Sequence, residues 1–79
     1  MRIDKYLKLT RVIKRRTVAN EACDAGRVQV NGKVVKASYE VKPEDVIEIG
    51  FGNRSVKLKV LAVKETVRKE EVDSLFEYV

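Results

Sequence analysis

The strongest constraint on the fold is a short stretch in the middle of the chain, from Arg27 to Val35. Residues 27–30 alternate between polar and apolar side chains, which is the pattern of a strand with one buried face. Asn31 and Gly32 follow, and this pair is typical of a two-residue type I′ turn, because both residues tolerate positive φ. Residues 33–35 then return as a second strand. The sequence therefore predicts a β-hairpin, and the other segments must fold around it.

Two helices are predicted ahead of the hairpin. Residues 4–13 place their apolar side chains on one side of a helix, and Asp4 suits its N-cap because a carboxylate can accept from the free N–H groups of the first turn. A second helix is expected from an N-cap at Thr17 to a stop at Gly26. Its small side chains would let it pack closely on the first helix. The apolar sector of the first helix holds Ile3, Tyr6, Leu7, Leu9, Thr10 and Ile13, and the small face of the second holds Val18, Ala19, Ala22, Cys23 and Ala25.

The second half of the chain predicts strands and a final helix. Residues 46–49 and 55–63 are expected as strands joined by a turn at 50–53, and residues 38–45, which contain the only proline, as a loop. From about Lys69, apolar residues recur at helical spacing through Val79 and predict a short, acidic, amphipathic helix. We therefore expect one α+β domain over residues 1–79. Two N-terminal helices would pack on a small, mainly antiparallel sheet, and a short C-terminal helix would follow.

The size and composition of the chain argue against an enzyme. Its 79 residues are near the lower limit for folding without disulfides or metals, so a deep catalytic cavity would compete with the core. There is no histidine, and the single cysteine, Cys23, leaves no zinc-type ligand set or Cys–His pair. Packing explains Cys23 better than nucleophilic chemistry does, and turn chemistry explains Glu44–Asp45. We expect no catalytic residue, no metal and no cofactor.

The location of the protein is also constrained. No signal-peptide pattern is present, and no segment approaches the roughly 20 apolar residues that cross a bilayer. A lone cysteine is typical of a reducing cytosol. We expect a soluble, cytoplasmic monomer with no membrane partner.

Positive charge is concentrated in the first half of the chain. Residues 1–36 hold ten Lys or Arg against three Asp or Glu, whereas residues 37–79 hold seven against nine. Three of the cations, Lys14–Arg16, stand directly ahead of the helix expected at Thr17, where the helix dipole disfavours positive charge by several tenths of a kcal/mol each. A bound anion resolves this conflict, because cations and free backbone N–H groups together form a phosphate site. The asymmetry is typical of nucleic-acid binding, although membrane-surface proteins share it.

Individual cations differ in how much they need a ligand to explain them. Lys5, Lys8 and Arg11 share one helix face and could hold a second phosphate or simply be solvated. Arg16 is the strongest candidate, because a guanidinium can hold a phosphate with two hydrogen bonds. Asp4 could orient Arg2 or Arg16 in addition to its capping role. The candidate RNA-binding residues are Arg2, Asp4, Lys5, Lys8, Arg11, Lys14, Arg15, Arg16, Thr17, Asn31 and Lys36, of which Asn31 is already explained by its turn.

The aromatic residues indicate which kind of nucleic acid is recognised. Tyr6 lies in the apolar sector of the first helix, and the other aromatic side chains are scattered rather than spaced along one strand face. A platform for stacking single-stranded bases is therefore not expected. We predict recognition of a structured RNA through its phosphates and shape.

The same residues resemble the S4 RNA-binding domain, also called the alpha-L motif. The resemblance covers about residues 1–50, with residues 51–79 as an extension. It implies two helices on a small sheet and a basic surface for structured RNA. Many members have Lys-Pro-Ser at residues 36–38 and Gly-Asp at 44–45, where this chain has Lys-Ala-Ser and Glu-Asp, so both departures lie outside the helical surface. The resemblance is carried by Arg2-Ile3-Asp4-Lys5-Tyr6-Leu7, Arg11, Lys14-Arg15-Arg16-Thr17, Ala19, residues 25–32 and Lys36-Ala37-Ser38.

Over its whole length the chain is similar to the free-standing RqcP (YabO) group of bacterial proteins, which are related to heat shock protein fifteen. This similarity implies a role in ribosome-associated quality control. The implied partners are large-subunit rRNA and peptidyl-tRNA on an obstructed large ribosomal subunit, with an RqcH-like factor during C-terminal alanine tailing. Two alternatives stay open: a general structured-RNA binder in ribosome assembly or tRNA binding, and a protein-interaction module that docks a partner through the acidic C-terminal helix. For that helix, packing on the chain's own sheet is favoured.

Overall fold

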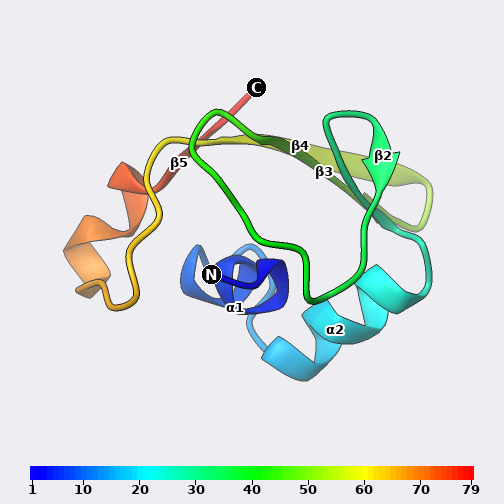
Figure 1. Cartoon of the computed structure of the whole chain (residues 1–79), viewed down its shortest axis with the longest axis horizontal. Helices are drawn as coiled ribbons and strands as arrows, with labels where there is room; N and C mark the ends of the chain where they lie inside the picture. Colours follow the sequence, from blue (N-terminus) through cyan, green and yellow to red (C-terminus); the bar gives the residue numbers. More distant parts are fainter.

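Two helices cover one face of a five-stranded antiparallel sheet (Figure 1). The computed structural model describes all 79 residues. The strand order is β2-β1-β3-β4-β5, so β3 is central and β2 and β5 are the edge strands. The predicted α+β class, with two N-terminal helices packed on an antiparallel sheet, is confirmed. The elements are α1 (Ile3–Leu9), α2 (Arg16–Asp24), β1 (Val28–Val30), β2 (Lys33–Val34), β3 (Val46–Phe51), β4 (Arg54–Val60), the 3₁₀ helix η1 (Lys69–Ser74) and β5 (Phe76–Tyr78).

The hairpin forms where the sequence predicts it. Asn31 and Gly32 have φ values of 52° and 85°, as a type I′ turn requires, and Val30 pairs with Lys33 across the turn. β3 is longer than predicted, because it continues to Phe51 instead of ending at residue 49. β4 ends earlier than predicted, because it leaves the sheet after Val60 instead of after residue 63.

The first helix is shorter than predicted at its C-terminal end. It stops at Leu9 because the chain turns at Arg11, whose φ is 64°. The Arg11 N–H donates to the Lys8 carbonyl at 3.0 Å, and the Ile13 N–H donates to the Leu7 carbonyl at 3.3 Å. These bonds satisfy the last carbonyls of α1 and fold Ile13 back into the core, so the helical spacing of Ile13 was misleading.

Both predicted N-caps are wrong by two residues. Arg2 is the N-cap of α1, so Asp4 lies inside the first turn. Arg15 is the N-cap of α2 because its backbone is the last extended one, so the helix begins at Arg16 and Thr17 lies inside it. Neither cap residue makes a side-chain capping hydrogen bond. The predicted stop at Gly26 is confirmed, since it has a φ of 75° and follows the last helical turn.

The predicted amphipathic helix at the C-terminus is wrong beyond Ser74. Only the 3₁₀ helix η1 forms, and the chain then enters β5, which pairs antiparallel with β4. The Leu75 carbonyl fastens this segment, because it accepts from Tyr6 Oη at 2.7 Å and from the Leu61 N–H at 2.8 Å. Leu75 and Phe76 are therefore buried in the chain's own core. The proposed docking helix does not exist in this fold.

The core lies between the helices and the sheet. Tyr6 is fully buried at its centre, as predicted, and Cys23 packs there from α2. Ala19 of the small-residue face is also buried, but Val18 is 46% exposed, so that face is narrower than predicted. None of the helices is long and apolar enough to cross a membrane.

Candidate nucleic-acid interface

A buried carboxylate organises the basic end of α1. Asp4 is only 2% exposed, yet it is surrounded by donors from three different segments. Its Oδ2 accepts from Arg2 Nη2 at 3.2 Å and from Asn20 Nδ2 at 3.3 Å, and its Oδ1 accepts from the Lys5 N–H at 2.8 Å. Arg16 Nη2 lies 3.5 Å from Oδ1 and completes the set as an ion pair. Asp4 therefore ties the start of α1 to the first two turns of α2.

The charge of Asp4 is maintained by these partners. Burial disfavours the ionised carboxylate and would raise its pKa. The Asn20 hydrogen bond, the Lys5 N–H and the nearby Arg16 and Arg2 charges outweigh burial, so the pKa of Asp4 lies below its ordinary value of 3.8. At neutral pH the site holds a carboxylate that keeps both arginines in place.

The two arginines remain available to a ligand. Their side chains are 46% and 47% exposed, although the acid that holds them is buried. They stand at the rim of an open hollow of about 440 Å³ in which every lining side chain is polar. The hollow is lined by Arg2, Asp4, Arg16, Thr17, Asn20 and Glu21. Its size and polarity suit a phosphate group rather than an apolar ligand.

The backbone around Arg2 is pinned by the loop before β3. The Val41 N–H donates to the Met1 carbonyl at 2.9 Å, and the Ile3 N–H donates to the Tyr39 carbonyl at 2.8 Å. Arg2 is bridged to Glu40 between these two bonds. The loop that begins at Lys36 thus reaches the N-terminal end of α1, which places exposed Lys36 at the same end of the helix as Arg2.

Arg16 is positioned by the start of α2. It is the first helical residue, and the first turn of this helix contains no acidic residue. The first N–H groups of a helix have no partner inside it, so they add partial positive charge beside the guanidinium. The conflict between cations and helix dipole that the sequence predicts is therefore present, although it centres on Arg15 and Arg16.

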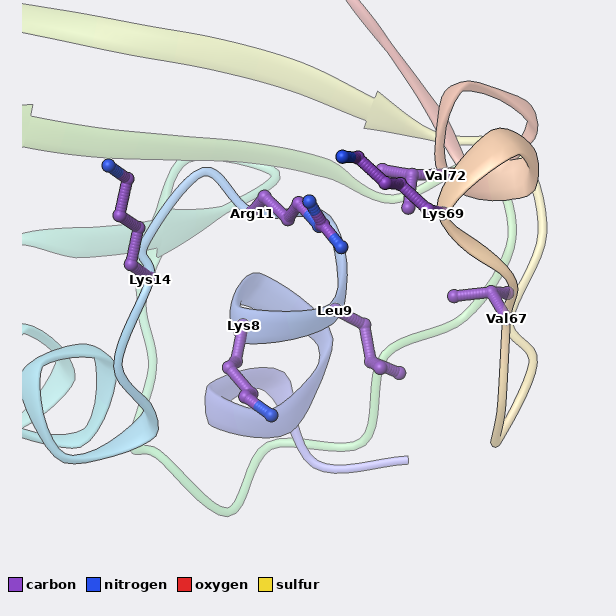
Figure 2. A pocket seen from close by; sticks show the side chains of 7 residues that line it. All are labelled: Lys8, Leu9, Arg11, Lys14, Val67, Lys69 and Val72. Carbon is purple, nitrogen blue, oxygen red and sulfur yellow. The ribbon is translucent and has the colours of Figure 1, made fainter.

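The structure divides the remaining predicted cations among separate places. Lys8, Arg11 and Lys14 do not join the Asp4 hollow, but line a second pocket beside Lys69 (Figure 2). Lys5 is paired with Glu65 at 2.7 Å. The predicted cations therefore do not form a single continuous cluster around the start of α2.

Asn31 has internal partners for both ends of its amide. Its Oδ1 accepts from the Val46 N–H at 3.0 Å, and its Nδ2 donates to Asp45 Oδ1 at 3.2 Å. Asp45 is buried and also accepts from Tyr39 Oη and the Lys42 N–H. These bonds join the hairpin turn to β3, and they support the turn role of Asn31 and of Asp45.

Two residues of these sites were missed in the sequence. Asn20 is not among the predicted site residues, although its position four residues after Arg16 places both on one side of the helix and indicates a possible shared partner. Lys69 carried no signal, because it reaches its pocket only through the fold of the C-terminal segment.

Cys23 is buried in the core, which confirms its predicted role as a packing residue. Its burial, and after it the charges of Asp4 and Asp24, raise the pKa of its thiol to about 11.

Comparison with known proteins decides the family. The model of the S4 domain matches residues 1–47, which include Arg2, Asp4, Arg16 and Asn20. The chain belongs to the S4 domain family. The Asp4 hollow therefore lies wholly within the S4 domain, whereas Lys69 lies outside the matched residues.

Relatives of this S4 protein extend the similarity to its full length. A protein of Streptococcus pneumoniae named "RQC P-site tRNA stabilizing factor" is 48% identical over 79 residues, which cover 100% of this chain and 90% of that protein. A protein of the same name from Bacillus subtilis is 46% identical over 76 residues, covering 96% and 88%. These matches confirm the family predicted from the sequence.

The fold of this S4 protein is shared by a solved structure. Heat Shock Protein 15 of Vibrio cholerae, described as trimeric, superposes with a TM-score of 0.90 at 25% identity. The superposition covers 100% of this chain and 81% of that one. It therefore includes β5 and the C-terminal segment as well as the S4 part.

Proposed function

We propose that this protein is a non-enzymatic RNA-binding factor of bacterial ribosome-associated quality control, which binds tRNA and rRNA on obstructed large ribosomal subunits. One observation carries the proposal. Within the S4 domain, a buried carboxylate holds two half-exposed arginines, one at the start of α1 and one at the start of α2. Such a preorganised pair fits the phosphates of a folded RNA.

The charge distribution supports RNA over a small anion. Ten of the seventeen cations lie in the first 36 residues, and the hollow is open rather than enclosed by apolar walls. Several phosphates would thus be contacted over a wide surface, which gives an affinity that falls steeply with salt. The aromatic residues are scattered along the sequence, which fits recognition of shape and backbone rather than base stacking.

The relatives indicate the setting. Their name includes a P-site tRNA, so we assign tRNA in that site to this chain as well, together with large-subunit rRNA and a cytoplasmic location. We also assign support of C-terminal alanine tailing with an RqcH-like factor, and action as a monomer. Exposed large apolar side chains occur on α2, β2, β3 and β5 and just after β4, and of these only Val18 and Phe51 line a common pocket, which supports the monomer.

Purification of the tagged protein from cells tests this function against its nearest alternative. We expect large ribosomal subunits that carry peptidyl-tRNA to be enriched with the wild-type chain. An Arg2→Glu/Arg16→Glu variant, checked for native fold by circular dichroism, should recover neither. Enrichment of subunit assembly precursors without tRNA would contradict the proposal and favour a role in ribosome assembly.

A further inference from the structure

A second basic pocket lies at the opposite end of α1 from the Asp4 hollow. It has a volume of about 350 Å³ and shares no lining residue with that hollow. Its walls come from two parts of the chain, the end of α1 with the turn that follows and the segment around η1 (Figure 2). The lining residues are Lys8, Leu9, Arg11, Lys14, Val67, Lys69 and Val72.

The pocket is lined mainly by cations. Four of its seven lining residues are cations and none is acidic. None of the four forms a salt bridge within the chain, whereas Arg2, Lys5 and Arg16 all do. Figure 2 shows the Arg11 and Lys69 side chains extending toward one another, whereas the ammonium groups of Lys8 and Lys14 point away from them. Like charges that line one pocket repel one another, and a bound anion would offset that repulsion.

The backbone conformation of Arg11 also indicates a binding site at this pocket. Arg11 and Gly26 occupy equivalent positions just after α1 and α2, and both have positive φ, 64° and 75°. Glycine is the usual residue there because a side chain strains this conformation. The chain uses glycine after α2 but arginine after α1. Strain of this kind is concentrated at binding sites.

The remaining wall is apolar. Leu9, Val67 and Val72 are half-buried and line the pocket beside the cations. A cationic rim with an apolar wall suits a nucleotide unit, whose phosphate is charged and whose sugar presents C–H groups. The helix between the two sites has seven residues and is therefore about 10 Å long, so one phosphate cannot occupy both.

We infer that this pocket binds a phosphate of an RNA strand and forms a second RNA contact, completed by Lys69 from outside the S4-matched residues. The inference rests on the RNA binding proposed above. It gives the C-terminal segment a role in binding, because η1 carries Lys69 and the core contacts of Leu75 hold that segment against α1.

Binding of a fluorescent RNA hairpin to the intact protein over a series of salt concentrations tests the inference. We expect Lys69→Gln to weaken binding by about tenfold and to reduce the salt slope by about one. Lys57→Gln is the matched control, since Lys57 is exposed on β4 without a salt bridge and lines neither site. A loss for Lys69→Gln no larger than for Lys57→Gln would overturn the inference.

Arg11→Gly separates binding from stability. Glycine relieves the positive φ, so this variant should unfold at a higher temperature than the wild type while it binds the hairpin more weakly. Unchanged RNA affinity in this stabilised variant would contradict the inference. If the wild type binds no hairpin, the proposed function fails as well. If it binds and only Arg2 and Arg16 matter, the second site alone fails.

The same hairpin distinguishes a strand from a free nucleotide. In amide NMR spectra, RNA should shift the signals of Arg11, Lys14 and Lys69. Adenosine monophosphate should shift them only weakly and should be displaced by the hairpin. Saturation of the pocket by adenosine monophosphate that RNA cannot displace would overturn the assignment to an RNA strand.

Discussion

Asp4 and Arg16 form an ion pair between α1 and α2, in which a 2%-exposed carboxylate lies 3.5 Å from a guanidinium that stays about half exposed. The distance is long for a strong hydrogen bond, so the guanidinium keeps donors free for a ligand. The carboxylate of Asp4 lies inside a basic surface and lowers the total attraction of that surface for RNA. The presence of this carboxylate indicates that the placement of Arg16 and Arg2 matters more than the net charge of the surface.

Replacing this acid separates placement from charge. Asp4→Asn raises the net charge by one, so bulk electrostatics alone would predict tighter RNA binding. We expect weaker binding, by about tenfold, because Arg2 and Arg16 lose their anchor, and a fall of about 1–3 kcal/mol in the free energy of unfolding. Fluorescence anisotropy with an RNA hairpin and urea unfolding measure the two effects.

Asp24→Asn is the matched control for this change. Asp24 is exposed at the end of α2 and forms no ion pair, so its neutralisation makes the same change in net charge. Binding by Asp24→Asn should equal or slightly exceed that of the wild type. If Asp4→Asn binds RNA as tightly as Asp24→Asn, then Asp4 does not position the arginines.

The lowered pKa of Asp4 predicts a sensitivity to acid. Because the folded-state pKa of Asp4 lies below its ordinary value of 3.8, the ionised carboxylate stabilises the fold at pH values above the pKa that Asp4 has in the unfolded chain. This contribution is lost as the pH falls through the folded-state pKa. Urea unfolding between about pH 6 and pH 3 should therefore show a larger loss of stability for the wild type than for Asp4→Asn. Equal losses in the two proteins would show that other carboxylates account for the acid sensitivity.

Asn31 is expected to act on stability and not on RNA. Asn31→Gly keeps the positive φ but removes the hydrogen bonds to Val46 and Asp45, so the free energy of unfolding should fall by about 1–2 kcal/mol. RNA affinity, measured at a temperature where the variant is folded, should change by less than about twofold. A larger loss of affinity would restore Asn31 as an RNA ligand.

Local signals in the sequence predicted the local features well. The Asn31–Gly32 turn and the Gly26 stop follow from positive φ, which few residues tolerate, and both occur where expected. The basic first half also indicated the region of the Asp4 hollow. These features are set by residues that are neighbours in the sequence, so local sequence patterns predict them.

Features set by distant contacts could not be predicted. Residues 69–79 have helical spacing, but Phe76-Glu77-Tyr78 also alternates, and the free edge of β4 decides in favour of the strand. The division of the cations into two sites depends on where η1 lies, because η1 brings Lys69 to the pocket that Arg11 and Lys14 also line. The predicted role of Asp4 in orienting Arg2 or Arg16 is confirmed for both arginines, whereas its partner Asn20 meets it only in the folded chain.

Cosedimentation of Arg16→Glu with large ribosomal subunits tests the central claim most directly. Arg54→Glu is the control, because Arg54 is exposed on β4 and lines neither site. Both variants should keep the wild-type circular dichroism spectrum. We predict that Arg54→Glu pellets with the subunits as the wild type does, whereas Arg16→Glu stays in the supernatant. Cosedimentation of Arg16→Glu at the level of Arg54→Glu would contradict the claim that the Asp4-held arginines form the RNA-binding surface.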